Sequence, residues 1–211
     1  MKTTRYVPAV YPRGIEMSKT SKMPQGSWSI DARRCNVGSK LRLVEGSVCR
    51  ECYALAGRYN IPVVQNAQER RYQAIWADNW VPMMAQLIYS QTWFRWFDAG
   101  DLQGIEHLVK IVAICKLTPA TNHWLPTKEY GVIRQYKRLH GDFPDNLVVR
   151  PSAPMVDGDP IDLGLPSSVV SRHRDYSEIA HLCPAKEQGG KCRDCRACWL
   201  ASVKVTNYPA H

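Results

Sequence analysis

The amino-acid sequence predicts an α/β protein built on a partial or truncated parallel β/α barrel, with a small open parallel sheet as the alternative. Stretches rich in strand formers alternate with helical patterns between residues 92 and 151. Strands joined by helices in this way form right-handed parallel crossovers. A complete eight-fold barrel needs about 250 residues, whereas this chain has 211. We expect cysteine-rich N- and C-terminal segments to close a metal-cluster site on this core.

The individual elements follow from apolar periodicity and from helix breakers. Proline and glycine interrupt residues 1–34, so we expect irregular chain there with a short strand at 27–30, followed by a compact loop at 35–52. A helical pattern covers about 63–90, with Tyr72, Ile75 and Trp76 on its buried face and Gln68 on its exposed face. Asn79 restarts the helix, with Pro82 in the first turn. The remaining elements are expected to be strands at 92–97, 122–125, 146–151 and 168–171, and helices at 104–117 and at 128–139, the last capped by Thr127.

The composition indicates one globular domain spanning residues 1–211. Apolar residues make up 45% of the chain and charged residues 22%, which is too apolar for a disordered protein. We divide the domain into an irregular cysteine-bearing segment (1–62), an α/β core (63–171) and a cysteine-rich C-terminal segment (172–211). The sequence leaves the oligomeric state open.

Charge and hydropathy restrict the location and the partners. The formal net charge is +9, which makes nucleic acid a candidate partner, although no dense basic run is present. The N-terminus lacks the apolar region of a secretory signal, and no run has the length of a membrane span. We therefore expect a cytoplasmic protein without a membrane partner. Thiols stay reduced in that compartment, so the eight cysteines predict metal ligands rather than disulfides.

The strongest metal signal is a run of cysteines near the C-terminus. Cys192, Cys195 and Cys198 are separated by two residues each, and Cys183 precedes a proline upstream. Two consecutive C-x-x-C steps with a Cys-Pro partner are a pattern of [4Fe–4S] ligation, although in bacterial ferredoxins the Cys-Pro follows the triplet. Zinc is the alternative, but its four-thiolate shells usually come from two separated pairs. We predict an iron–sulfur cluster on these four cysteines.

A second cysteine group consists of Cys35, Cys49 and Cys52. Three thiolates leave one metal position open unless a fourth ligand comes from elsewhere, and an open position is the kind that does chemistry. These cysteines hold a second cluster or contribute to the first; alternatively, Cys35 is a small core residue and the other two are a chance pair. The eighth cysteine, Cys115, lies on the apolar stripe of a predicted helix and is expected to be a core residue.

Polar residues follow each predicted strand of the core. Asp98, Gly100 and Asp101 come after the first strand, Lys128 after the second and Arg150 at the end of the third. Because the carboxyl ends of parallel strands share one edge, we take Asp98, Asp101, Lys128 and Arg150 as catalytic candidates and Asp98, Gly100 and Asp101 as cofactor-binding candidates. Such a rim suits a small anionic or zwitterionic ligand. The local alternative is that the acidic residues are turn and cap residues.

Several motifs in order resemble the phage-borne gene product 88 family. The match runs from about Cys35 to Trp199, and this family resemblance implies phage origin and a cysteine-bound cluster rather than a particular reaction. The motifs are Gly46–Ala54 (GSVCRECYA), Arg95–Asp101 (RWFDAGD), Trp124–Lys128 (WLPTK) and Cys192–Trp199 (CRDCRACW).

The chain also resembles, more weakly, the radical S-adenosylmethionine enzymes. They use a partial parallel barrel and three cysteines on a [4Fe–4S] cluster with one open iron. Their first strand ends in a Gly-Gly-Glu-Pro-like turn, whose place Asp98–Asp101 would take here. The spacing departs from their C-x3-C-x2-C motif, because Cys35 lies far upstream of Cys49 and Cys52. The resemblance implies S-adenosylmethionine as a candidate cofactor.

Three function classes follow from these features. The first is an iron–sulfur enzyme, radical or redox, that acts on a small molecule. The second is a nucleic-acid-binding module stapled by zinc or by the cluster. The third is a protein of electron transfer or redox sensing.

Overall fold

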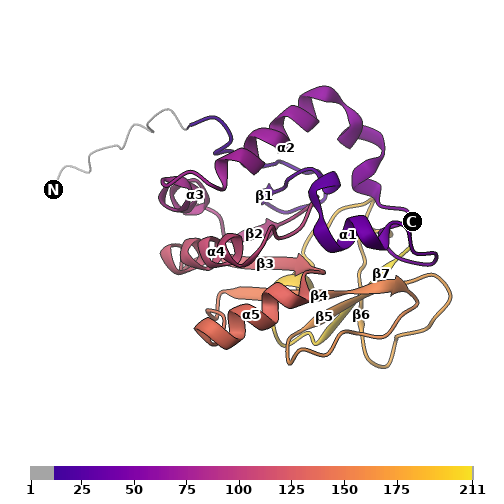
Figure 1. Cartoon of the computed structure of the whole chain (residues 1–211). Helices are drawn as coiled ribbons and strands as arrows, with labels where there is room; N and C mark the ends of the chain where they lie inside the picture. The colour runs from indigo at the N-terminus through magenta and orange to yellow at the C-terminus, as the bar shows by residue number, and fades with distance from the viewer. Residues whose placement is uncertain (1–11, 211) are drawn as a thin grey trace.

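A seven-stranded sheet in which all paired strands run parallel forms the centre of the molecule (Figure 1). The computed structural model describes residues 12–210. The spatial order of the strands is β1-β2-β3-β4-β5-β7-β6, so β1 and β6 are the edges. The strands are β1 (Ser27–Trp28), β2 (Trp93–Trp96), β3 (Asn122–Thr127), β4 (Leu147–Val156), β5 (Ser167–Ser171), β6 (His181–Leu182) and β7 (Val205–Pro209). The α/β class is confirmed, whereas these pairings do not show a barrel.

Helices follow the early strands in sequence, as the predicted crossovers require. Consecutive helices α3, α4 and α5 lie side by side along the sheet (Figure 1). None of the helices within residues 12–210 has the length and apolar character needed to cross a membrane. The helices are α1 (Asn36–Leu41), α2 (Pro62–Ala74), α3 (Trp80–Ile88), α4 (Ile105–Leu117) and α5 (Tyr130–His140), with short 3-10 turns η1 (Ala32–Arg34), η2 (Tyr53–Leu55), η3 (Gly57–Asn60) and η4 (Ala197–Trp199).

The main core lies between these helices and one face of the sheet. Side chains alternate along a strand, so Phe94 and Trp96 of β2 are fully buried in this core, as is Leu125 of β3. Cys115 on α4 is also fully buried in it, which confirms its expected place in the core. The helices contribute Trp80, Met84, Ile88, Leu108, Ile111, Ile114, Ile133 and Tyr136.

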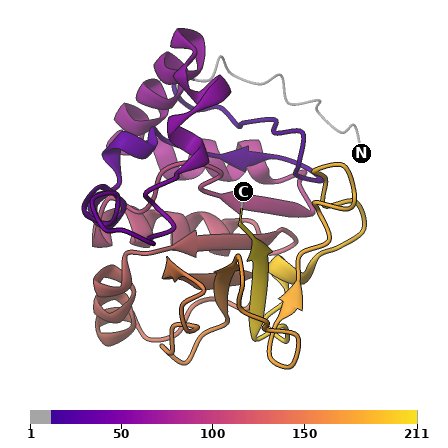
Figure 2. The ribbon, with the colours of Figure 1, turned by 90° about the vertical axis from the view of Figure 1, so that its right-hand side faces the viewer.

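The opposite face of the sheet is covered by the C-terminal segment. Trp93 of β2 and Trp124 of β3 pack there against Cys192, Cys198 and Trp199. The indole Nε1 of Trp199 donates a hydrogen bond to the Phe94 carbonyl of β2 at 2.9 Å. Figure 2 shows this orange-to-yellow chain running beside the strands. The strands of the one sheet thus come from all three segments into which the sequence was divided.

A glycine fixes the chain immediately after β2. Gly100 has a φ of +80°, and a methyl group on it would lie 2.4 Å from Cγ1 of Ile30. Only glycine tolerates this combination of left-handed backbone and close approach. The amide of Ile30 also donates to the Ala99 carbonyl at 3.2 Å. The contact fixes the loop that carries Asp98 and Asp101.

Several local expectations were wrong. Residues 36–41 form helix α1 rather than loop, and strands β6 and β7 were not foreseen. The predicted buried face of α2 is confirmed for Ile75, which is fully buried, and for Tyr72, which packs on the main core. It is wrong for Gln68, which is 2% exposed, and for Trp76, just after the helix, which is 41% exposed. The C-terminal end of α2 packs on the main core through Ala74, while Arg71 on the same helix donates to Ser29 Oγ at 3.3 Å. The irregular chain predicted for residues 1–11 lies outside the described residues.

Candidate metal centres

The fold brings the three N-terminal cysteines together beside the carboxyl-terminal edge of the sheet. A methyl group built on Gly38 of α1 would lie 3.6 Å from the Cys35 sulfur and 3.7 Å from the Cys49 sulfur. Burial raises the pKa of the Cys35 thiol, and the charges of Asp101, Cys52 and Cys49 raise it further. Cys35 and Cys52 also pack around the same small apolar cluster. Cys35 therefore lies close to Cys49 and Cys52 in space, although it precedes them by a loop along the chain.

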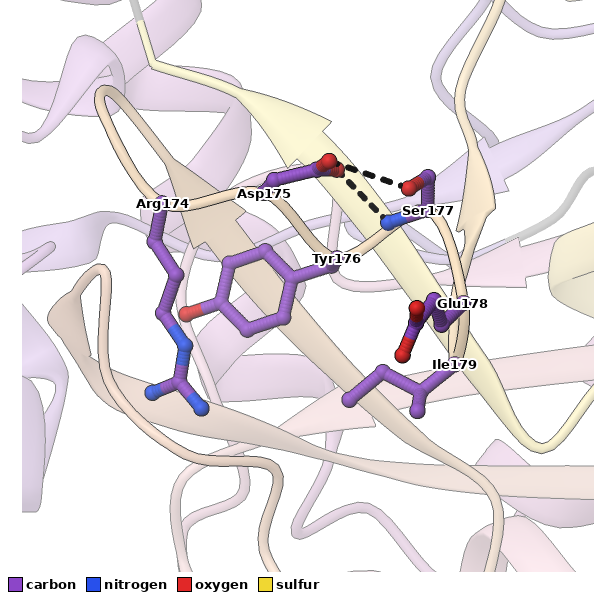
Figure 3. Close-up of a pocket in the computed structure, with 6 residues that line it drawn as sticks. All are labelled: Arg174, Asp175, Tyr176, Ser177, Glu178 and Ile179. Carbon is purple, nitrogen blue, oxygen red and sulfur yellow. Dashed lines mark hydrogen bonds between the residues drawn. The ribbon is translucent and has the colours of Figure 1, made fainter.

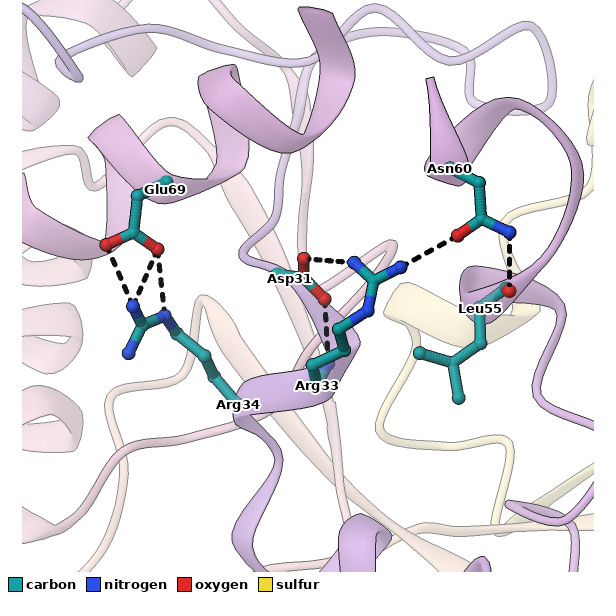
Figure 4. Close-up of polar contacts among 6 residues, drawn as sticks. All are labelled: Asp31, Arg33, Arg34, Leu55, Asn60 and Glu69. Atoms are coloured by element: carbon teal, nitrogen blue, oxygen red, sulfur yellow. Dashed lines mark hydrogen bonds and ion pairs between the residues drawn. The ribbon is translucent and has the colours of Figure 1, made fainter. Parts of the chain in front are cut away.

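An ion pair anchors the chain that leads into Cys35. Arg34, the residue before it, binds both carboxylate oxygens of Glu69 on α2, with its Nη2 2.8 Å and 2.7 Å from them and its Nε 3.0 Å from one of them (Figure 4). The guanidinium also lies 3.7 Å from the ring centre of Tyr72 on the same helix. Two-point binding fixes the direction of the side chain as well as its position. Helix α2 therefore holds η1, and with it Cys35, in place.

A neighbouring contact ties Cys35 to the chain after Cys52. Arg33 donates to Asp31 at 2.7 Å and to Asn60 at 2.8 Å (Figure 4). Asn60 in turn donates to the Leu55 carbonyl at 2.9 Å. These bonds connect η1 with η2 and η3, so two segments that carry cysteines are held against each other.

Residues from the ends of β2 and β3 lie beside this group. Asp101 accepts hydrogen bonds from the Leu102 amide at 2.8 Å, from the Thr127 hydroxyl at 2.5 Å and from the Lys128 amide at 2.8 Å. The Lys128 charge lowers the pKa of Cys49 against the larger, raising effect of burial. Lys128 and Arg42 are therefore cations close to the N-terminal cysteines, while the Asp101 carboxylate joins two loops.

The four C-terminal cysteines also gather in space. The Cys192 amide donates to the Lys22 carbonyl at 2.9 Å, and the Cys183 amide donates to the Asn207 carbonyl of β7 at 2.8 Å. Burial raises the pKa of Cys192, and the charges of Cys183 and Cys195 act in the same direction. Burial likewise raises the pKa of Cys198 to about 11. The four thiols therefore form a second group, held by the sheet and by the N-terminal segment.

Two sulfurs of this group have polar partners. The Cys198 sulfur lies 3.1 Å from the Tyr208 hydroxyl, which also accepts a hydrogen bond from Thr206 at 3.2 Å. The Cys195 sulfur lies 3.5 Å from Nε2 of His181. Partners of this kind orient a thiolate and stabilise its charge.

The donor set of both groups fits a thiolate-bound metal centre, although no ligand set is already assembled. All eight cysteines are free thiols. Within residues 12–210, no group of three or more His, Cys, Asp or Glu side chains is arranged to hold a metal ion. Neighbouring thiols nevertheless lie close enough to Cys35 and to Cys192 for their charges to raise the pKa of these two residues. Thiolates that repel one another in this way are the ligands that a bound cation stabilises.

The four catalytic candidates of the predicted rim have different surroundings in the structure. Asp98 is buried and accepts hydrogen bonds from Ser27 at 2.8 Å and from Tyr59 at 3.1 Å. Asp101 and Lys128 lie together near the N-terminal cysteines. Arg150 faces the C-terminal segment instead, because its place in β4 directs it to the face opposite the helices. The four catalytic candidates therefore do not converge on one site.

Sequence reasoning missed Arg95, which lies close to the C-terminal group. Its guanidinium lies 4.6 Å from the ring centre of Trp124, whose centroid is 5.1 Å from that of Trp199. The signal was available, since an arginine in the middle of the aromatic stretch Trp93–Phe97 must share the face of its strand with aromatic neighbours.

A surface hollow of about 270 Å³ lies in the loop after β5 (Figure 3). Asp175 accepts hydrogen bonds from the Ser177 amide at 2.8 Å and from its hydroxyl at 3.0 Å. Arg174 pairs with Asp159 at 2.7 Å. These polar groups serve the local turn, so the hollow adds nothing to the candidate centres.

A comparison with protein families settles the relationship of the chain. The family model described as Gene product 88 matches residues 12–201. The chain belongs to the gene product 88 family. This confirms the resemblance of its motifs, whereas the comparisons give no support to a radical S-adenosylmethionine relationship. No curated protein and no solved structure matches this gene product 88 chain.

Proposed function

We propose that this chain is a phage-encoded iron–sulfur protein that binds a [4Fe–4S] cluster at Cys183, Cys192, Cys195 and Cys198. The observation that carries the proposal is the gathering of seven cysteines into two thiol groups, while Cys115 alone is buried in the helical core. Four cysteines are the usual ligand set of such a cluster. The cytoplasm of the infected cell, where thiols stay reduced, is the matching location.

We further propose a second centre at Cys35, Cys49 and Cys52, and this is where a reaction on a small molecule would take place. A cluster supplies one-electron transfer when bound, and three thiolates leave one metal position free. Lys128 is one of two cations near Cys49, with Arg42, and would hold an anionic group of a small molecule. The contacts of Asp98, Gly100 and Asp101 support a structural role for that loop. S-adenosylmethionine stays a prediction that rests on the three-cysteine arrangement.

The parallel sheet supports the finer assignment of a partial β/α barrel. The first five strands follow one another in spatial order, as they do in a β/α barrel. In such a fold functional groups collect at the carboxyl ends of the strands, which is where Lys128 lies.

The test is anaerobic purification of the full chain with iron, sulfide and zinc analysis. We expect about four iron and four sulfide per chain for one cluster and about eight of each for two. Replacing Cys192 and Cys195 together by Ala should remove the C-terminal share of the iron. Cys115→Ala is the matched control, because its thiol lies in the core, and should leave the iron content unchanged.

Two outcomes would contradict the proposal. Iron content that is insensitive to the C-terminal cysteines would exclude them as ligands. One or two zinc ions per chain without visible colour would make the cysteines structural staples. That result would favour the nucleic-acid-binding alternative, which predicts an affinity for DNA or RNA that falls steeply with salt concentration.

A further inference from the structure

Arg150 is a fully buried cation whose hydrogen bonds all go to neutral groups. Its side chain is 0% exposed. Nη1 donates to the carbonyls of Ser167 at 2.9 Å and Val203 at 3.1 Å. Nη2 donates to the carbonyls of Ala197 and Leu200, both at 3.2 Å. The last two residues flank Cys198 and Trp199, so the guanidinium holds the turn that carries the Cys198 thiol.

Arg150 also lacks a compensating charge. Within residues 12–210, no carboxylate lies within 4.0 Å of it, and its buried Nε has no hydrogen-bond partner. Burying a charge without a counter-ion costs on the order of several kcal/mol. Burial lowers the pKa of Arg150, and the nearby Tyr208 and Cys198 raise it again. The unbalanced charge therefore points to an anion beside Cys198.

Arg95 adds a second positive charge from β2. Its Nε is buried and without a partner in the described part of the chain. The guanidinium lies over Trp124, which packs on Trp199, the residue after Cys198. Its Nη2 also donates a hydrogen bond at 3.5 Å to the hydroxyl of Tyr53, the residue after Cys52. Arg95 from β2 and Arg150 from β4 thus both place a positive charge beside the turn that carries Cys198 and Trp199.

The N-terminal cysteines face a different set of charges. Glu129 accepts a hydrogen bond at 2.9 Å from the amide of Val37, two residues after Cys35, and Asp101 accepts one from the Lys128 amide at 2.8 Å. Lys128 and Arg42 are the cations near Cys49. A centre there would be formed between acidic and basic groups, whereas one at the C-terminal cysteines would be formed next to Arg95, Arg150 and Lys22. The reduction potential of an iron–sulfur cluster rises when nearby positive charge stabilises its more negative, reduced state.

We propose that Arg95 and Arg150 are the counter-charges of an anionic iron–sulfur centre at the C-terminal cysteines, and that they make it the more readily reduced of the two centres. This rests on the proposed function. Reduction adds one electron, taken from dithionite in the experiment below, and neither a bond nor a proton is exchanged. The N-terminal centre is then the low-potential one, and the C-terminal centre accepts the electron first.

The experiment isolates the C-terminal centre in the full chain. Cys35, Cys49 and Cys52 are replaced by Ala, the protein is loaded with iron and sulfide under anaerobic conditions, and the EPR signal of the reduced centre is followed in a dithionite titration. Arg95→Met is then compared with Arg95→Lys in this background. Methionine keeps the apolar contact with Trp124 but removes the charge, whereas lysine keeps the charge.

We expect Arg95→Met to bind the same iron and to have a more negative midpoint potential. At a fixed potential, the ratio of reduced to oxidised centre should fall on the order of tenfold, which corresponds to about 59 mV for a one-electron couple. Arg95→Lys should retain most of the original potential. In the chain with all cysteines present, the signal of the C-terminal centre should appear first in the titration.

The failures of the two proposals are distinguishable. Iron that loads normally with an unchanged potential in Arg95→Met would overturn the counter-charge proposal alone. A titration in which the N-terminal centre is reduced first would also overturn it. A chain that takes up no iron at the C-terminal cysteines would overturn the proposed function, and the counter-charge proposal with it.

Discussion

Two histidines illustrate how single buried residues set the properties of this protein. His123 is stacked on Trp96 and shares a hydrogen bond of 2.9 Å with the Thr118 hydroxyl. His107 lies against Trp28 and Trp80. Burial lowers the pKa of His107 and of His123 to about 3. One ring nitrogen of each is buried without a partner in the described part of the chain, so both imidazoles are neutral in the folded state.

The neutral histidines predict a loss of stability in mild acid. Their pKa in the unfolded chain is about 6.5, so the unfolded state takes up protons first as the pH falls. Their contribution to stability is complete above about pH 6.5 and is lost towards pH 3, by about 1.4 kcal/mol per pH unit for each histidine. Urea unfolding at pH 7 and pH 5 should show His123→Gln to have the shallower pH dependence. Equal slopes in the variant and the parent would refute the assignment.

At the scale of elements, the connections between strands are fixed by side chains at the strand ends. Asp101 joins the loop after β2 to the end of β3 through Thr127 and Lys128. The Thr127 hydroxyl also accepts a hydrogen bond from the Glu129 amide at 3.0 Å, close to the start of α5. Thr127 therefore assists the helix start as predicted, although Glu129 is the residue at the cap position.

We therefore expect the main contribution of Asp101 to be to the stability of the fold. Asp101→Ala leaves the Leu102 amide, the Lys128 amide and the Thr127 hydroxyl without their acceptor, and each unsatisfied buried donor costs about 1–3 kcal/mol. We expect a loss of about 3 kcal/mol in urea unfolding. Asp142→Ala, at an exposed carboxylate 3.6 Å from Lys137, is the control and should change stability by less than about 1 kcal/mol. Similar midpoints for the two variants would contradict the structural role.

At the scale of the whole molecule, the C-terminal segment completes the fold. It supplies β7, which pairs along its length with β5, and it covers Trp93 and Trp124 on the face opposite the helices. Arg150 makes three of its four hydrogen bonds to carbonyls of this segment. The cysteine-rich end is therefore part of the same cooperative unit as the α/β core.

A chain that ends at Ser171 should not fold cooperatively. It loses β6 and β7, uncovers two tryptophans and leaves Arg150 with one of its four acceptors. Exposed apolar surface of this kind promotes association. We expect a gradual urea transition and early elution in size-exclusion chromatography, whereas a chain that begins at Pro12 and keeps the C-terminus should unfold sharply. A sharp transition in the shortened chain would show that residues 172–211 are dispensable.

Features encoded within one segment were predictable from the sequence. The helices α3 and α4 and the strands β2–β5 were found because apolar periodicity is a local property. The short spacing of the C-terminal cysteines restricts how far apart they lie, whereas their role as metal ligands stays a prediction. The order of motifs identified the family without any structure.

The tertiary structure alone decided what lies around these residues. Cys35 lies close to Cys49 because α1 passes beside both and because the Arg34–Glu69 ion pair holds η1 in place. Arg150 faces the C-terminal segment rather than Asp101. β6 and β7 become strands because they pair with the sheet, although one is only two residues long. Spacing along the chain controls local conformation, but the charge that faces a thiol depends on which strands are neighbours. That depends on the order of the strands in the sheet, which no single segment encodes.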